Sequence, residues 1–169
     1  MTTDKKDAIQ LLKADHREVE ELFEKFEKAS GADRKQKIAQ QICTVLTIHA
    51  MIEEEIFYPA CEGKIDEALL KEAYVEHDAA KVLIAEIDAG EPSEEFYDAK
   101  VKVLKEEIEH HVKEEERSQD SMFHQARKAE IDLDALGEQL TARKEELKLQ
   151  IEAQGLPKPE TRTLEQATL

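Results

Sequence analysis

The chain has 169 residues, of which 24 are basic and 40 acidic, so its formal net charge is −16. A surface this acidic repels nucleic acids and anionic membranes, and we expect neither as a partner. Glycine (5) and proline (4) are scarce, which favours long helices over a β-sandwich, and the length suits one ordinary domain. We find no membrane-length apolar run and no secretory signal, and therefore expect a cytoplasmic protein.

Breaking residues around Gly31, Gly63, Gly90 and Gly155 divide the chain into predicted helices. The predicted helices span residues 5–29, 33–58, 66–89, 94–117 and 133–154. Asp33 and Ser93 are placed to cap the second and fourth of them, and the second connection is expected to begin at Pro59. Short connections between helices of similar length imply antiparallel neighbours. The predicted fold class is therefore all-α, an up-down-up-down four-helix bundle with an additional C-terminal helix.

The expected domain organisation follows from these boundaries. Residues 1–126 would form the bundle, residues 127–156 a C-terminal helical extension, and residues 157–169 a flexible tail. Leucines and an isoleucine recur along one side of helix 133–154. That apolar side predicts packing either on the bundle or against a second copy in a homodimer.

Each main helix carries an apolar stripe at helical spacing, and one histidine interrupts each stripe near its middle. These histidines are His16, His49, His77 and His111. Measured from the predicted turns at about 1.5 Å per residue, their heights agree to within roughly one helical turn. Four imidazoles from four helices should therefore converge on one level of the bundle interior.

Two glutamates join this polar layer, because Glu53 follows His49 and Glu115 follows His111 by four residues. Residues four apart share a helix face, so each His-x-x-x-Glu pair can reach one interior point. Unpaired carboxylates are costly in an apolar core, whereas imidazole and carboxylate together bind iron, manganese or zinc. A lone core histidine is usually a packing residue, and a lone His-x-x-x-Glu is weak in a glutamate-rich chain. The prediction of a metal site therefore rests on the whole set.

Six donors exceed the needs of one tetrahedral zinc and divide naturally between two ions. His16 and His49, from the first two helices, would hold one ion. His77 and His111 would hold the other, and both glutamates would bridge the two ions. Open positions on paired redox metals would bind O₂, peroxide, NO, or an oxo or hydroxo bridge. In each run of three glutamates, at 53–55 and 114–116, the site needs only one, and we expect the rest on a solvated face. The predicted metal ligands are His16, His49, Glu53, His77, His111 and Glu115.

With these residues in place, the sequence resembles hemerythrin-like proteins of the HHE cation-binding family over about residues 8–126. The resemblance is carried by Ala14-Asp15-His16, by the segment from His49 to Pro59, by Glu76-His77, and by the segment from His111 to Glu116. It implies a non-haem di-iron centre inside a four-helix bundle, with two iron ions held by the six predicted ligands.

The sequence departs from this family pattern beside His77. Oxygen-carrying hemerythrins have a second histidine four residues away on that helix, where this chain has Ala73 and Lys81. The departure leaves one metal more open. Tyr74 lies one turn from His77 and is either a substitute ligand or a core residue.

The second His-x-x-x-Glu motif also departs from the first. His124 stands where a proline follows in the first motif, after an interval three residues longer, which predicts a bulge, a kink or an extra turn. His110 precedes His111, so the fourth helix offers two candidate ligands, of which the stripe periodicity favours His111.

Ferritin-like di-iron proteins share this architecture but need a Glu-x-x-His on each of two helices. Only Glu107 and His110 have that spacing, and Glu107 lies beside the apolar stripe.

Three functions remain open. The first is binding of O₂ or a related small ligand in oxygen, iron or redox handling. The second is an enzyme on the same metals, decomposing hydrogen peroxide or reducing NO. The third is sequestration of iron or zinc, or a structural metal. Cys43 and Cys61 lie too far apart along one predicted helix to form a disulfide, and nothing indicates a pocket for a large organic molecule.

Overall fold

The computed structural model describes residues 5–165; residues 1–4 and 166–169 lie outside the described part. No strand occurs between residues 5 and 165. The elements are α1 (Ala8–Lys28), α2 (Ala32–Ile52), the π-helical turn η1 (Glu53–Phe57), α3 (Tyr58–Cys61), α4 (Glu67–Ala89), α5 (Tyr97–Val112), the π-helical turn η2 (Lys113–Arg117), α6 (Met122–Lys128) and α7 (Leu133–Gln154).

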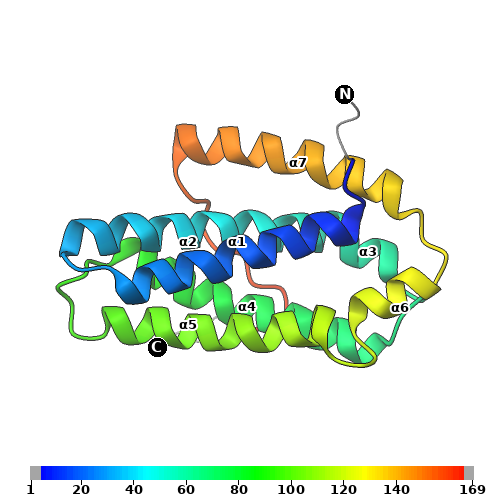
Figure 1. Cartoon of the computed structure of the whole chain (residues 1–169), viewed down its shortest axis with the longest axis horizontal. Coiled ribbons are helices and arrows are strands. Elements are labelled where there is room, and N and C mark those ends of the chain that lie inside the picture. The colour runs from blue at the N-terminus through cyan, green and yellow to red at the C-terminus, as the bar shows by residue number, and fades with distance from the viewer. Residues whose placement is uncertain (1–4, 166–169) are drawn as a thin grey trace.

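Four long helices, α1, α2, α4 and α5, form an antiparallel bundle, and α7 lies along its outside over α1 and α2 (Figure 1). The predicted all-α bundle with an additional C-terminal helix is therefore confirmed. None of the helices within residues 5–165 combines the length and the apolar character that crossing a bilayer requires.

Aspartate caps fix where several helices begin. Asp7 accepts a hydrogen bond from the backbone N–H of Gln10 at the start of α1, and Asp66 accepts from the first turn of α4. Asp132 accepts from the backbone N–H of Ala135 at the start of α7. These bonds satisfy backbone donors that have no partner within the helix.

Two of the caps predicted from sequence are wrong. Helix α2 begins at Ala32 after Gly31, and no side chain caps it, so Asp33 lies inside the first turn. Helix α5 begins at Tyr97 because residues 91–97 form successive turns, closed by bonds to the carbonyl oxygens of Glu91 and Glu94.

The core consists of two apolar clusters with the histidines between them. On α1, His16 stands between Leu12 of one cluster and Val19 of the other. On α2, His49 likewise stands between Leu46 and Ile52. Each buried Leu, Ile or Phe stabilises the fold by about 1.5–3 kcal/mol, so tightly packed apolar layers enclose the polar layer on both sides.

Both His-x-x-x-Glu motifs run into a π-helical turn. The N–H of Tyr58 bonds to the carbonyl of Glu53 in η1, and the N–H of Ser118 bonds to that of Lys113 in η2. A bulge was one of three alternatives predicted for the longer second motif, but the first motif has a matching π-helical turn that was not predicted, so the turn does not account for the longer interval before His124. Helical structure continues through Pro59 to Cys61, so the connection begins later than expected.

Helix α7 packs on the bundle through Leu136, Leu140 and Leu147, all buried. The chain then continues as an extended segment that lies against α4, where Asp78 accepts hydrogen bonds from backbone N–H groups of residues 162–164. The sequence predicted a flexible tail over residues 157–169; its last four residues lie outside the described part.

Candidate metal centre

The six side chains predicted as ligands lie together in the middle of the bundle. They come from α1, α2, η1, α4, α5 and η2, one residue from each. All are buried, with relative exposures of 5% or less. The four histidines therefore lie at one level of the bundle, as predicted from the rise per residue of a helix.

The donor atoms form two groups. Nε2 of His16 lies 3.2 Å from Nε2 of His49, and Nε2 of His77 lies 3.2 Å from Nε2 of His111. Glu115 belongs to both groups, and Glu53 belongs to the second. Within each group, the donor atoms all lie within 4.8 Å of one another. The pairing of histidines is the one expected from sequence.

The two carboxylates span these pairs. Oε1 of Glu53 lies 2.9 Å from Nε2 of His49 and 3.2 Å from Nε2 of His77. Oε2 of Glu115 lies 4.0 Å from Nε2 of His16, and its Oε1 contacts Nε2 of His111. Oε1 of Glu53 also lies 3.9 Å from Nε2 of His111. Each carboxylate thus faces histidines of both pairs, as a ligand that bridged two metals would.

A carboxylate also faces the outer nitrogen, Nδ1, of every histidine. A carboxylate can only accept, so each Nδ1 carries a proton, and Nε2 is the nitrogen that faces the interior and can bind a metal. Outer carboxylates of this kind orient histidine ligands in metal sites. The contacts are His49–Asp15 at 3.1 Å, His77–Glu54 at 3.1 Å, His111–Glu76 at 2.9 Å and His16–Glu116 at 3.3 Å.

Sequence reasoning missed these outer carboxylates. Glu54 and Glu116 were expected on a solvated face, but their side chains are only 4% exposed. The expectation was wrong because each of these glutamates meets the outer Nδ1 of a histidine on a neighbouring helix, a contact that assignment to a solvated face leaves out. The detectable signal was adjacency, since Asp15 and Glu76 each immediately precede a predicted histidine ligand.

The donor set fits a metal centre. Both carboxylate oxygens of Glu53 and Oε2 of Glu115 are buried without a hydrogen-bond partner. They face the Nε2 atoms of the histidines, so either a proton on the imidazole or a metal cation must lie between the two sets of lone pairs. Mixed imidazole and carboxylate donors suit iron, manganese or zinc.

The pKa values of His49 and His111 show that these imidazoles are protonated when no metal is bound. Burial lowers the pKa of His49, but Glu53 and Asp15 outweigh it and raise that pKa to about 10. Burial alone would lower the pKa of His111. The carboxylate of Glu115 outweighs burial, so the pKa of His111 is raised well above its usual value. Without metal, the carboxylates therefore hold protons on these imidazoles, and a binding metal must displace those protons.

Tyr58 is a site residue that sequence reasoning did not find. Its hydroxyl donates to Oε1 of Glu115 at 3.0 Å and lies 3.1 Å from Nε2 of His77 and 3.4 Å from Nε2 of His111. Burial, with the charges of Glu115 and Glu53, raises the pKa of Tyr58 well above 10, so the hydroxyl stays protonated. In a regular α-helix, a residue five positions after Glu53 would face away from it, and η1 returns it to the same face.

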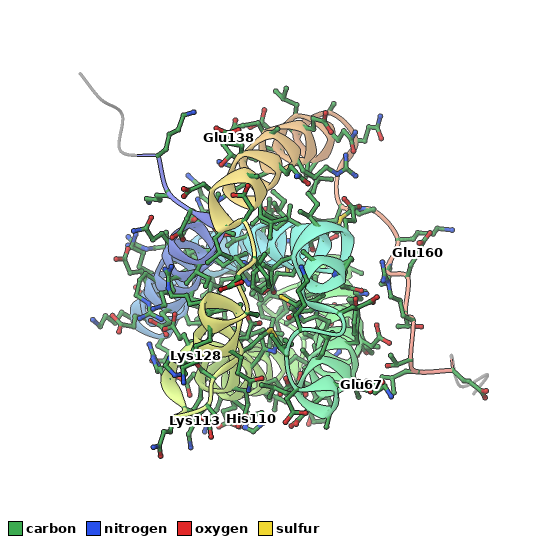
Figure 2. The ribbon with its side chains drawn as sticks, turned by 90° about the vertical axis from the view of Figure 1, so that its right-hand side faces the viewer. Glu67, His110, Lys113, Lys128, Glu138 and Glu160 are labelled. Carbon is green, nitrogen blue, oxygen red and sulfur yellow. The ribbon has the colours of Figure 1, made fainter. Side chains whose placement is uncertain are left out.

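The other sequence candidates lie outside the cluster. Tyr74 packs its ring edge-on against Tyr58, with centroids 5.2 Å apart. The side chain of His110 is 56% exposed against 5% for His111, and it lies at the periphery in Figure 2. His124 is exposed on α6. The helical register therefore points His111, and not His110, into the interior.

Comparisons with known proteins agree with this arrangement. The family model described as Hemerythrin HHE cation binding domain matches residues 7–118. A DNA nickase from Nostoc sp. is 33% identical over 106 residues, 63% of this chain and 30% of the nickase, so the chain spans less than a third of that curated relative. The crystal structure of an HHE cation binding domain-containing protein from Mycobacterium kansasii superposes with a TM-score of 0.73 at 24% identity, covering 89% of this chain and 95% of that one. This last likeness shows the fold.

Proposed function

Since the chain belongs to the hemerythrin HHE cation-binding family, we propose that it is a non-haem di-iron protein that binds O₂ or a related small ligand in oxygen, iron or redox handling. One observation carries the proposal: Glu53 and Glu115 each face histidines of both pairs. Carboxylates so placed would hold two metals side by side. A single structural zinc would need only four donors.

The ligands follow from the geometry. His16 and His49 would hold one metal and His77 and His111 the other, with the two glutamates bridging. When bound, two iron ions would supply open coordination positions and electrons for exchange with a small ligand. The protein contributes orientation through the outer carboxylates, and the apolar clusters above and below exclude bulk water from the site.

A second function, decomposition of hydrogen peroxide or reduction of NO, is favoured by Tyr58. Its protonated hydroxyl lies within 3.4 Å of both histidines of one pair. A proton donor at that place can protonate an oxygen atom of a bound ligand, which reversible binding does not require. The missing histidine beside His77 leaves room for such a ligand.

We place either function in the cytoplasm, because Cys43 and Cys61 are both free thiols, as is usual in a reducing compartment.

Protein purified from iron-replete cells tests both functions. Metal quantification should give about two irons per chain, as expected for two sites of this donor set. An optical spectrum that disappears on deoxygenation and returns with O₂ would support ligand binding, and steady O₂ evolution from hydrogen peroxide would support the enzyme. Iron held without either response would indicate sequestration. One zinc per chain and no iron would overturn the di-iron proposal.

A further inference from the structure

A cavity of about 540 Å³ adjoins the metal centre. Pockets for small organic molecules measure about 300–1,000 Å³, whereas a water molecule occupies only about 30 Å³. The space is therefore far larger than O₂ or peroxide needs. No sequence motif marks this pocket, because its walls come from helices and a segment that are far apart in the chain.

The cavity touches the metal centre on the outer side of its histidines. All four histidines line it, together with Asp15 and Glu54, which contact outer Nδ1 atoms, whereas the cavity lining among residues 5–165 includes none of Glu53, Glu115 and Tyr58. The walls beyond are mostly aliphatic, from α1, α2, α4 and α5. They include Val19, Val45, Leu46, Ala80, Ile84 and Ile108.

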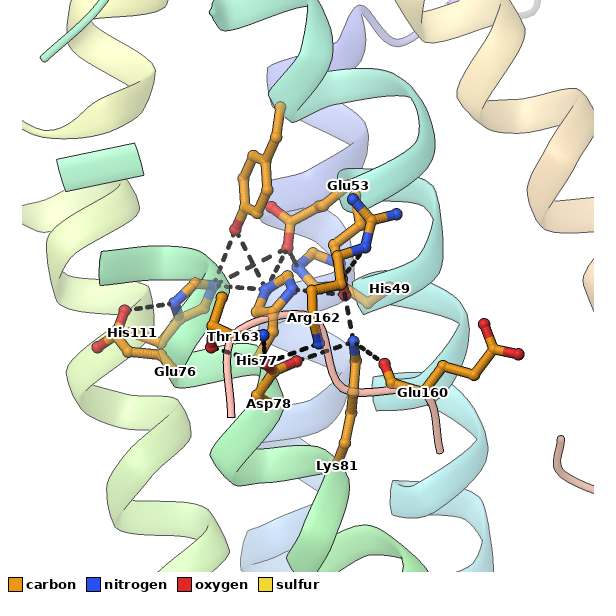
Figure 3. Close-up of polar contacts among 12 residues, drawn as sticks. His49, Glu53, Glu76, His77, Asp78, Lys81, His111, Glu160, Arg162 and Thr163 are labelled. Carbon is orange, nitrogen blue, oxygen red and sulfur yellow. Dashed lines mark hydrogen bonds and ion pairs between the residues drawn. The ribbon is translucent and has the colours of Figure 1, made fainter. Parts of the chain in front are cut away.

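Residues 156–162 of the extended segment after α7 form the outer wall. The buried carboxylate of Asp78 anchors this segment by accepting from the N–H of Thr163 at 2.6 Å and from its hydroxyl at 2.7 Å. Nζ of Lys81 donates to the carbonyl of Glu160 at 2.9 Å. Figure 3 shows these contacts beside His77, and Figure 2 shows the segment with Glu160 along the side of the bundle.

The charged groups that line the cavity are mostly acidic. Arg162 lies 3.1 Å from Glu54, and Lys81 lies 3.0 Å from Glu54 and 3.3 Å from Asp78. Lys158 also lines the cavity without an ion pair among residues 5–165, but the lining carries five carboxylates against three cations. This net negative charge disfavours an anionic ligand, whereas a neutral polar group can accept or donate hydrogen bonds near the imidazoles.

We propose that this cavity binds a neutral small organic molecule with an apolar body and one polar end, such as an alcohol or an alkyl hydroperoxide. The polar end lies at the histidines, beside their outer carboxylates, and residues 156–162 cover the apolar body. The inference goes beyond the proposed function, because it names a class of molecule that binds next to the metal centre.

Binding of 1-octanol to the full chain tests this inference without any catalytic readout. Calorimetry and NMR titrations on metal-free and zinc-loaded protein should show one saturable site, with shifts confined to the cavity residues. Ala85→Phe, which fills the cavity, should weaken octanol binding at least tenfold. Val75→Phe, at an exposed position of the same helix outside the cavity lining, is the matched control and should leave binding unchanged.

The covering segment has its own test. Thr163→Pro removes both the N–H and the hydroxyl that Asp78 accepts, so hydrogen exchange over residues 156–165 should speed up and octanol should dissociate faster. If circular dichroism shows that Ala85→Phe does not fold, Val45→Phe narrows the cavity from α2 instead.

The outcomes separate this inference from the proposed function. Protein that holds two metals but binds no octanol, or binds it equally after Ala85→Phe, overturns the cavity proposal alone. Protein that binds octanol in the cavity but takes up no iron leaves the cavity proposal standing and overturns the di-iron function.

Discussion

The carboxylate of Asp15 on α1 lies 3.1 Å from Nδ1 of His49 on α2, while its neighbour His16 faces the interior from α1 itself. The same relationship, in which a carboxylate contacts the histidine of the next helix, is found around the rest of the bundle. Glu54 contacts the histidine of α4, Glu76 that of α5, and Glu116 that of α1. Each helix thus supplies one inner histidine and orients the histidine of the next helix. The last contact, from Glu116 to the histidine of α1, completes the ring.

We expect Asp15→Asn to weaken metal binding about 10- to 100-fold, as is typical when the carboxylate behind a histidine ligand is removed. The asparagine keeps the size of the side chain but loses the charge that holds the proton on Nδ1 of His49. Competition titration with a coloured chelator measures the change. Glu18→Gln, an exposed change on the same helix, should have no effect. Equal affinities for the two variants would show that the outer carboxylate does not support the metal.

The adjacent histidines on α5 provide a second test. His111→Ala should abolish stable loading of the second metal, because the side chain lies between Glu115 and the other histidine of its pair. His110→Ala should leave loading intact, since that side chain is largely exposed. Metal content after desalting distinguishes them, and the reverse result would mean that α5 has a different register in solution.

The level of the four histidines was predictable because the rise per residue of a helix is constant. Distance from a turn therefore fixes depth, and His16, His49 and His77 could be placed without knowing their neighbours. The same regularity revealed the inward direction of Glu53, four residues after His49.

The parts of the site that were missed depend on departures from that regularity. Tyr58 reaches the site because η1 adds a residue to one helical turn, and no local pattern marks a π-helical turn in advance. The cover formed by residues 156–162 depends on Asp78, a single buried acceptor more than 80 residues earlier in the chain.

Tyr58→Phe tests the role of the buried hydroxyl. We expect the variant to fold and to load both metals, but to decompose hydrogen peroxide about 100-fold more slowly, as is usual on losing a proton donor. The optical spectrum of the iron-loaded protein should also shift, because the hydroxyl donates to Glu115. Tyr97→Phe, at a buried tyrosine in the cluster far from the site, should change neither. An unchanged rate and spectrum in Tyr58→Phe would remove Tyr58 from the mechanism.

The two thiols should be inert in the folded protein. Burial, assisted by Asp88, raises the pKa of Cys43 to about 12. Burial, with the charges of Glu53 and Glu115, raises that of Cys61 to about 12. Only the thiolate reacts, and it forms as the pH rises towards the pKa, so at pH 8 neither thiol should be alkylated by iodoacetamide. Mass spectrometry should find both alkylated in denaturant, and rapid labelling of the folded protein would contradict their burial.

Gly137→Ala tests whether α7 docks as closely as the structure shows. A Cβ there would lie 2.7 Å from the carbonyl oxygen of Lys6 and 3.0 Å from the backbone nitrogen of Ala8. Backbone atoms cannot move aside as a flexible side chain does, so α7 must shift away from α1. Such overpacking costs about 1–3 kcal/mol, whereas helix propensity alone would stabilise the variant by about 1 kcal/mol. The two effects have opposite signs, so thermal unfolding separates them. A lower Tm than wild type, with Gln139→Ala on the exposed face of α7 as the control, is the expected result. A higher Tm would mean that α7 has room at this position.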